Sequence, residues 1–233
     1  MKSARWQSNL CWLVLASSAP AALAHGVSGS DASFVAESAS AQVAPFIYLG
    51  AKHMVTGYDH LLFILGVIFF LYRMRDVALY VTLFSIGHSI TLLAGVFGQV
   101  RASPWLVDAV IGLSVAYKAF DNLGGFRTVF GVQPDARLAV LGFGLVHGFG
   151  LATKLLALKP AGEGLVANMV SFNVGVELGQ LCALAVIVLV MARWRRSPGF
   201  KRHAFAANVV LMGAGFLLTQ YQLAGYFLSR SAV

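Results

Sequence analysis

The sequence predicts an all-α membrane protein, a single bundle of six transmembrane helices that follows a cleaved signal peptide. Hydrophobic residues make up 58% of the chain, charged residues only 11%, and the mean hydropathy is +0.77. A soluble domain typically carries about 25% charged residues. The apolar residues also gather in long segments, without the alternation of apolar and polar residues that is typical of a membrane barrel. The 233 residues leave room for one compact bundle and no separate soluble domain.

Residues 1–24 are typical of a secretory signal peptide. Lys2 and Arg5 form a basic start, residues 10–16 form a short apolar core, and residues 22–24 read Ala-Leu-Ala, a small-residue cleavage site. An uncleaved first span is the alternative, but the apolar core is too short to cross a bilayer. We therefore expect cleavage after residue 24.

The mature chain would then begin at His25. Residues 25–44 are rich in Ser, Ala and Gly, and we expect them to form a flexible periplasmic leader. A free terminal amine next to the His25 imidazole can chelate copper, which is a second possible metal feature. Because Cys11 would leave with the signal, Cys182 would have no intramolecular partner, and a disulfide framework is excluded in the mature monomer.

Residues 45–233 are the predicted transmembrane domain. Each of its six apolar segments is long enough to cross a hydrocarbon core about 30 Å thick. A backbone in lipid must satisfy its own hydrogen bonds, so these segments are expected to be helices. The expected spans are residues 45–72, 77–98, 104–121, 137–158, 164–192 and 204–229.

The basic residues predict the orientation. A cleaved signal places the mature N-terminus outside, so the loops after the first, third and fifth spans would be cytoplasmic. These loops and their flanks hold ten Lys or Arg residues, against five on the outer side. This bias agrees with the positive-inside rule and predicts an inner-membrane protein with both mature termini in the periplasm. The net charge of +8 is explained by this bias and by the attraction of basic residues to lipid headgroups. We therefore infer no nucleic-acid binding.

Ionisable residues lie near the middle of four predicted spans: Asp59 and His60, His88, His147 and Glu177. Such a group at bilayer depth costs on the order of 2.5–3.5 kcal/mol and is tolerated when it faces a partner or a water-filled cavity. A lone histidine can equally be an interhelical hydrogen-bonding residue. Four helices with such groups at one depth indicate one shared polar site inside the bundle.

The first span carries an H-x5-D-H pattern. A helix turns about 100° per residue, so His53 and His60 lie on one stripe two turns apart, with Gly57 between them. Glycine there leaves room for an ion or a neighbouring helix. Asp59 points about 100° away from His60 on a straight helix, so we expect it to orient a histidine of another helix.

In the fifth span, Asn173, Glu177 and Gln180 line one face, and in the second span Ser85 lies close to His88. Asn173 and Gln180 alone are typical of helix packing. Imidazole nitrogen with carboxylate oxygen suits Ni, Co, Zn, Cu or Fe and does not select among them. The candidate metal ligands are His53, Asp59, His60, His88, His147 and Glu177, with secondary roles for Ser85, Asn173, Gln180 and His25.

These motifs resemble the HupE/UreJ family of membrane proteins, over nearly all of the chain after the signal. The resemblance is carried by H-x5-D-H with Leu61-Leu62-Phe63, by Gly87-His88-Ser89, by His147-Gly148-Phe149-Gly150 and by residues 172–180. The family is associated with nickel or cobalt uptake for hydrogenase and urease maturation. The resemblance implies metal recognition by His53, Asp59 and His60. The hydrogenase-associated members have a second, histidine-richer motif where this chain offers only His147, so the chain looks closer to a second branch of the family.

The leading hypothesis is a divalent-metal permease, not an enzyme, with nickel or cobalt favoured and zinc or copper as alternatives. Its metal site would lie near the bilayer midplane, where secondary transporters commonly bind substrate. One alternative is an intramembrane zinc hydrolase in which His60, His88 and His147 bind zinc, Asp59 or Glu177 acts as base and Ser85 assists. Another is a copper-handling or assembly partner of a metalloenzyme complex, in which the terminal histidine matters most. The sequence sets no oligomeric state.

Overall fold

The computed structural model describes residues 30–38, 40–158 and 162–231, which form helices and no strands. The expected signal peptide, residues 1–24, and His25 lie outside the described residues. The helices are α2 (Ser30–Glu37), α3 (Val43–Thr56), α4 (Tyr58–Ile68), α5 (Met74–Phe97), α6 (Pro104–Asn122), α7 (Gly125–Phe130), α8 (Ala136–Ala157), α9 (Leu165–Arg195) and α10 (Phe200–Ser231).

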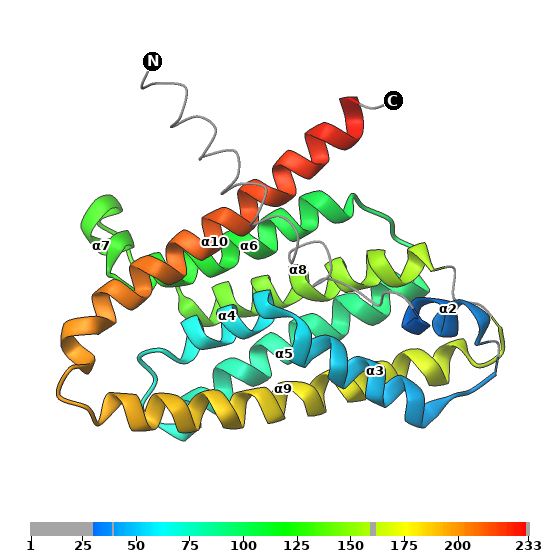
Figure 1. Ribbon diagram of the computed structural model, residues 1–233, viewed down its shortest axis with the longest axis horizontal. Coiled ribbons are helices and arrows are strands. Elements are labelled where there is room, and N and C mark those ends of the chain that lie inside the picture. Colours follow the sequence, from blue (N-terminus) through cyan, green and yellow to red (C-terminus); the bar gives the residue numbers. More distant parts are fainter. Residues whose placement is uncertain (1–29, 39, 159–161, 232–233) are drawn as a thin grey trace, which may run out of the picture.

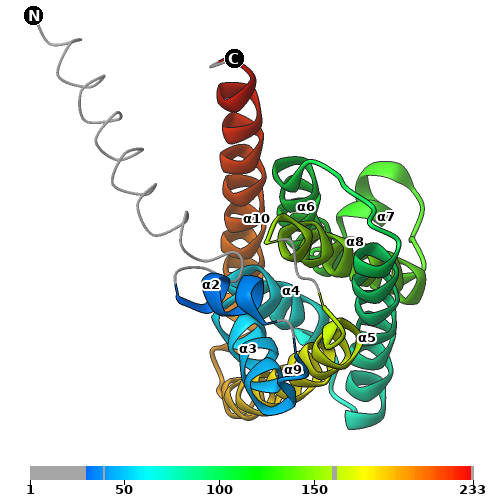
Figure 2. The ribbon, with the colours of Figure 1, turned by 90° about the vertical axis from the view of Figure 1, so that its right-hand side faces the viewer.

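The long helices run side by side along the long axis of an elongated bundle (Figure 1). Three pairs of helices pack most extensively: α3 with α9, α5 with α8, and α6 with α10. The view along the bundle shows α3, α4 and α9 grouped on one side, with α5, α6 and α8 on the other (Figure 2). Contacts between α5 and α9, which join these groups, are sparse. α4 packs against α6 and also joins the two groups, whereas α5 and α9 meet at a looser junction that we call the α5–α9 seam.

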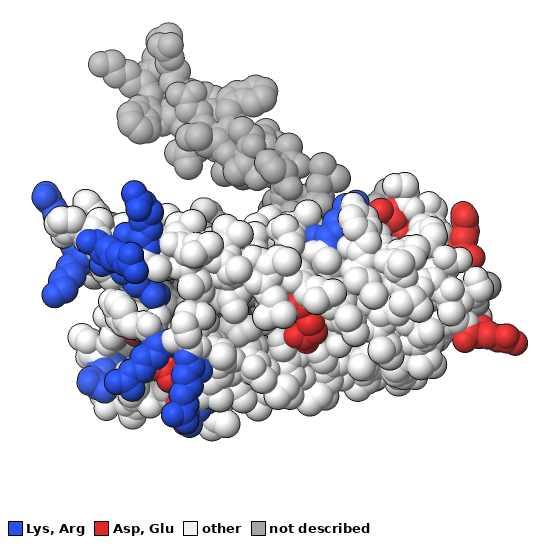
Figure 3. All heavy atoms as spheres, turned by 90° about the horizontal axis from the view of Figure 1, so that it is seen from below, with Lys and Arg blue, Asp and Glu red and all other residues white. Residues whose placement is uncertain are grey.

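Four of the described helices, α5, α8, α9 and α10, are long and apolar enough to cross a membrane. On the face shown in Figure 3, most Lys and Arg side chains gather at one end of the molecule, and its middle is almost free of charge. The described part of the chain is therefore all-helical, with four candidate membrane spans, as expected for a helical membrane protein.

The first expected span, residues 45–72, is not one helix. It consists of α3 and α4, which are separated at Gly57, where the backbone is extended (φ −75°, ψ 95°). Glycine has a low helix propensity, which weakens the helix at this point. A Cβ on Gly57 would also lie 2.8 Å from His60 Nδ1, closer than a carbon atom can approach. Glycine is thus required for this close packing at the break.

Part of the segment expected as a flexible leader is ordered. It contains α2, whose Val35 is fully buried and whose Phe34 packs against the core. Asp31 Oδ2 of α2 forms an ion pair with Lys52 Nζ of α3 at 2.6 Å. These contacts attach α2 to one end of the bundle (Figure 1). Composition alone does not reveal them because they depend on a distant helix.

The α5–α8 pair approaches closely because glycines of α8 face the backbone of α5. A Cβ on Gly148 would collide with the carbonyl oxygen of His88, and one on Gly144 would collide with the carbonyl oxygen of Phe84. Thr91 Oγ1 on α5 donates a hydrogen bond to Leu145 O on α8 at 2.6 Å. Small residues allow this approach in membrane helices. The glycines thereby hold the segment that carries His88 against the segment of α8 around residue 147.

Candidate functional site

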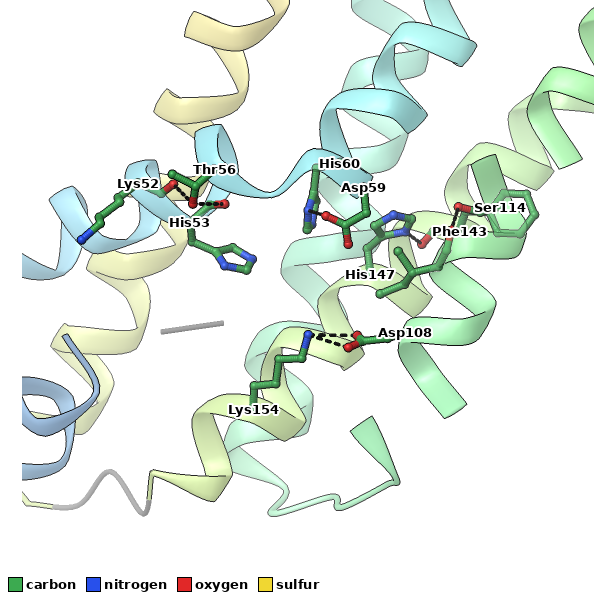
Figure 4. Close-up of polar contacts among 11 residues, drawn as sticks. Lys52, His53, Thr56, Asp59, His60, Asp108, Ser114, Phe143, His147 and Lys154 are labelled. Carbon is green, nitrogen blue, oxygen red and sulfur yellow. Dashed lines mark hydrogen bonds and ion pairs between the residues drawn. The ribbon is translucent and has the colours of Figure 1, made fainter. Parts of the chain in front are cut away.

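Four buried imidazoles from four different helices meet inside the bundle. The centre of the His60 ring, on α4, lies 5.3 Å from that of His53 on α3, 6.0 Å from that of His88 on α5 and 5.1 Å from that of His147 on α8. Each of the four residues is less than 9% exposed. His60 is therefore the centre of the group, which we call the imidazole cluster. Figure 4 shows three of its members, His53, His60 and His147.

Asp59 contacts the central imidazole. His60 Nδ1 lies 3.0 Å from Asp59 Oδ1, and both residues are buried. A carboxylate accepts, so Nδ1 donates its proton to it, and the lone pair of the ring is placed on Nε2. That nitrogen has no hydrogen-bond partner among the described residues. A carboxylate that fixes the tautomer of a histidine is a common feature of metal sites.

Asp59 makes this contact with its own neighbour because the straight helix assumed from the sequence does not exist. Residue 57 interrupts the helix, and Asp59 and His60 lie in the first turn of α4. The expected two-turn stripe from His53 to His60 is therefore absent, yet the bend still brings the two rings together.

The imidazoles of His147 and His88 differ in their hydrogen bonding. His147 Nδ1 donates to the carbonyl oxygen of Phe143 at 2.7 Å, which leaves the lone pair on Nε2. Neither nitrogen of His88 has a hydrogen-bond partner among the residues that the structure describes. A buried polar group without a partner costs about 1–3 kcal/mol and calls for an explanation. Binding of a ligand to His88 would supply one.

Aromatic rings enclose the cluster. The ring of Phe84 lies 5.0 Å, and that of Phe63 5.2 Å, from the ring of His147, centre to centre. Both phenylalanines are almost completely buried. This wall keeps the surroundings of the imidazoles apolar, which strengthens electrostatic interactions inside it.

The helix break adds backbone groups to the site. α3 ends at Thr56, three residues after His53, and the last carbonyl groups of a helix carry a partial negative charge. Thr56 Oγ1 and the backbone N–H of Gly57 satisfy some of these carbonyls. In membrane transporters, the C-terminal ends of interrupted helices commonly coordinate cations. The end of α3 thus favours positive charge next to the imidazoles.

The spacing of the rings suits metal binding, but their present orientation does not. Two imidazoles that bind one metal through nitrogens at about 2.1 Å have ring centres roughly 5 Å apart. Two of the three spacings around His60 are close to this value. Within residues 30–38, 40–158 and 162–231, however, no three His, Cys, Asp or Glu side chains are arranged to hold a metal ion. Coordination by three or more of them would require the rings to rotate.

Glu177 does not join the imidazole cluster. It lies near the middle of α9 and accepts a hydrogen bond from Ser89 Oγ of α5 at 3.0 Å. Ser89 Oγ in turn accepts from Asn173 Nδ2 at 3.0 Å, and Gln180 Nε2 donates to Ser85 Oγ at 2.7 Å. The residues expected at one site therefore form two groups, and the second lies at the α5–α9 seam.

Sequence reasoning missed Asp108. This buried residue of α6 pairs with Lys154 of α8, whose Nζ lies 2.9 Å from Oδ1 and 2.8 Å from Oδ2 (Figure 4). Lys154 is two turns beyond His147 on α8, toward the end of the bundle that carries α2. The signal that could have revealed the pair is a carboxylate one turn after Pro104, inside an apolar segment and far from its other carboxylate at residue 121.

Comparison with known proteins identifies the family. A family model described as "HupE / UreJ protein" matches residues 29–230. No curated protein and no solved structure matches the chain. The family match includes the broken helix, the imidazole cluster and the α5–α9 seam, and it covers nearly the whole sequence. The chain belongs to the HupE/UreJ family.

Proposed function

We propose that this protein is a divalent transition-metal permease of the inner membrane, with nickel or cobalt as the favoured substrate. The family is associated with nickel or cobalt transport and with hydrogenase or urease maturation, which supports this choice. The observation that carries the proposal is the buried imidazole cluster, contributed by four helices around a helix break. Imidazole and carboxylate donors suit nickel, cobalt, zinc and copper.

The proposed topology has six crossings after a cleaved signal at residues 1–24 and a periplasmic leader at residues 25–44. α3 and α4 together make the first crossing, and α5, α6, α8, α9 and α10 make the others. The 19 residues of α6 are close to the roughly 20 that a crossing needs. The basic end of the bundle would be cytoplasmic by the positive-inside rule, and both mature termini would be periplasmic.

Within this topology the imidazole cluster is the proposed midplane site. His60 is held by Asp59 with Nε2 available, while His88 has no competing hydrogen bond in the described part of the chain. His53 lies at the end of α3, and His147 would complete the donor set. A permease must release its substrate, so a site that coordinates only after the rings rotate fits transient binding. The permeating metal would supply cytoplasmic metalloenzyme maturation.

The two alternatives are supported less well. In the hydrolase, Ser85 and Glu177 would assist a zinc ion at the histidines, but both belong to the α5–α9 seam and hydrogen bond there. Only Asp59 lies beside an imidazole as a base would. The copper-handling role rests on His25, which lies outside the described residues.

Uptake of radioactive nickel or cobalt into proteoliposomes tests the proposal. The changes His60→Ala and His88→Ala should each abolish uptake while the protein still inserts, because each removes an imidazole from the cluster. His203→Ala is the matched control, since His203 is an exposed histidine at the start of α10. Uptake at the wild-type rate in both cluster variants would refute the permease site.

Elemental mass spectrometry of the purified protein separates the permease from the hydrolase. Exchangeable nickel or cobalt, lost in His60→Ala, would agree with the permease. Tightly held stoichiometric zinc, lost in the same variant, would support the hydrolase instead.

A further inference from the structure

The seam between α5 and α9 contains a crevice of about 420 Å³. Its polar lining consists of Thr82, Ser85 and Ser89 of α5 and Glu177 and Gln180 of α9. These residues lie near the middle of both helices, at the depth of the imidazole cluster. Ser85 and Gln180 are buried and form the floor of the crevice, while Ser89 and Glu177 are half-buried above them.

Glu177 has no basic partner within the described residues. Its carboxylate accepts a hydrogen bond from Ser89 Oγ, and no described Lys or Arg forms an ion pair with it. An ionised carboxylate at bilayer depth is costly unless a counter-charge compensates it. The compensating charge must therefore be a bound cation or a proton.

The hydrogen bonding of Asn173 favours a bound cation over a proton on Glu177. Its Nδ2 donates to Ser89 Oγ, the same hydroxyl that donates to Glu177. Its Oδ1 is buried and accepts no hydrogen bond from the described residues. A proton on Glu177 would neutralise the carboxylate but leave this amide oxygen without a partner. A cation bound next to Ser89 would compensate both groups.

The donors in the crevice select the kind of cation. They are carboxylate, hydroxyl and amide oxygens, and no imidazole or thiol lines the crevice. Oxygen donors suit hard cations, whereas nickel and cobalt favour the imidazoles of the other cluster. The crevice supplies one negative charge, so a monovalent ion leaves it neutral while a divalent ion leaves an uncompensated positive charge in an apolar region.

We propose that the α5–α9 crevice is a site for a hard monovalent cation, with sodium as the ion tested, in which Glu177 and Ser89 line the crevice and Asn173 contacts Ser89 from beside it. Gln180 orients the floor of the site through its hydrogen bond to Ser85. Secondary transporters commonly place a coupling-ion site near the bilayer midplane beside the substrate site. Sodium binding itself does not depend on the metal-permease function.

Binding of radioactive sodium to the purified full-length protein in detergent, without transition metal, tests this proposal. Saturable binding is expected that unlabelled sodium displaces and that choline, a large organic cation, displaces poorly. Glu177→Gln should weaken it by more than about tenfold, a difference of about 1.4 kcal/mol. Glu163→Gln is the control, because Glu163 is exposed in the segment that precedes α9.

Ser89→Ala is a second, milder substitution for the same assay, and it should also weaken sodium binding. Each variant is first checked for a single symmetric peak in size-exclusion chromatography. Absence of saturable sodium binding in the wild type would overturn the proposal and leave a protonated Glu177. Equal sodium affinity in the wild type, Glu177→Gln and Ser89→Ala would overturn the assigned site. Because no nickel or cobalt is present, failure of the metal-permease proposal would not change these outcomes.

Discussion

Removal of the Asp59 carboxylate tests whether the central imidazole is held ready for metal. In Asp59→Ala, His60 Nδ1 loses the acceptor that lies 3.0 Å away, and the ring loses both its preferred tautomer and its orientation. In Asp59→Asn, the amide oxygen can still accept from Nδ1, but the negative charge is lost. The two changes therefore separate orientation from charge.

The expected magnitude follows from this geometry. Loss of a group that orients a metal-binding histidine typically lowers metal affinity by about 10–100-fold. Asp59 and His60 are each nearly completely buried, so water cannot readily replace the lost acceptor. We expect Asp59→Ala to fall in this range, and Asp59→Asn to lose less affinity, because it keeps the hydrogen bond.

The assay is isothermal titration of nickel and cobalt into the detergent-purified protein, with uptake into proteoliposomes as a parallel measurement. Glu37→Ala is the control, because Glu37 is an exposed carboxylate at the end of α2. Wild-type affinity in Asp59→Ala, together with lost affinity in His60→Ala, would refute the orienting role of Asp59. Equal losses in Asp59→Ala and Asp59→Asn would show that charge matters and orientation does not.

Two further predictions concern stability, measured by thermal unfolding in detergent. Gly148→Ala should destabilise the protein by about 1–3 kcal/mol, since the new Cβ would force α8 away from α5. Gly142→Ala on the same helix is the control, because a Cβ there meets open space and the change should be neutral or stabilising. Equal effects of the two changes would contradict the packing argument. Lys154→Met should cost about 3–5 kcal/mol because it leaves the buried carboxylate of Asp108 without its partner. The double change with Asp108→Leu should recover most of that loss, and a double variant no more stable than Lys154→Met would contradict this prediction.

Much of the architecture could be predicted because the length and hydropathy of a segment are local properties. Five of the expected spans, from 77–98 onward, each correspond to one helix of the structure, with ends within a few residues. The first span could not be predicted correctly. Its apolar pattern continues through Gly57, and a glycine weakens a helix without by itself ending it.

The candidate site was predictable only in part. The sequence indicated that His60, His88 and His147 lie at one depth, and the rings of His88 and His147 do lie next to that of His60. His53 was not expected at that depth, yet the bend between α3 and α4 brings its ring to His60 as well. Depth does not indicate which way a side chain points around the helix axis. Glu177 has the expected depth, but it faces the seam and not the imidazoles.

The sequence by itself determined that the chain forms apolar helices, that its basic residues lie mainly at one end, and that imidazoles recur at mid-depth. The tertiary structure alone decided how those polar groups divide between two sites. His88 and Ser89 are neighbours in the sequence, yet a helix turns about 100° per residue. His88 therefore reaches the imidazole cluster while Ser89 reaches Glu177 at the seam. The rotation of α5 about its axis is set by the glycines of α8 against which it packs, a contact between segments about 60 residues apart that no local pattern in the sequence contains.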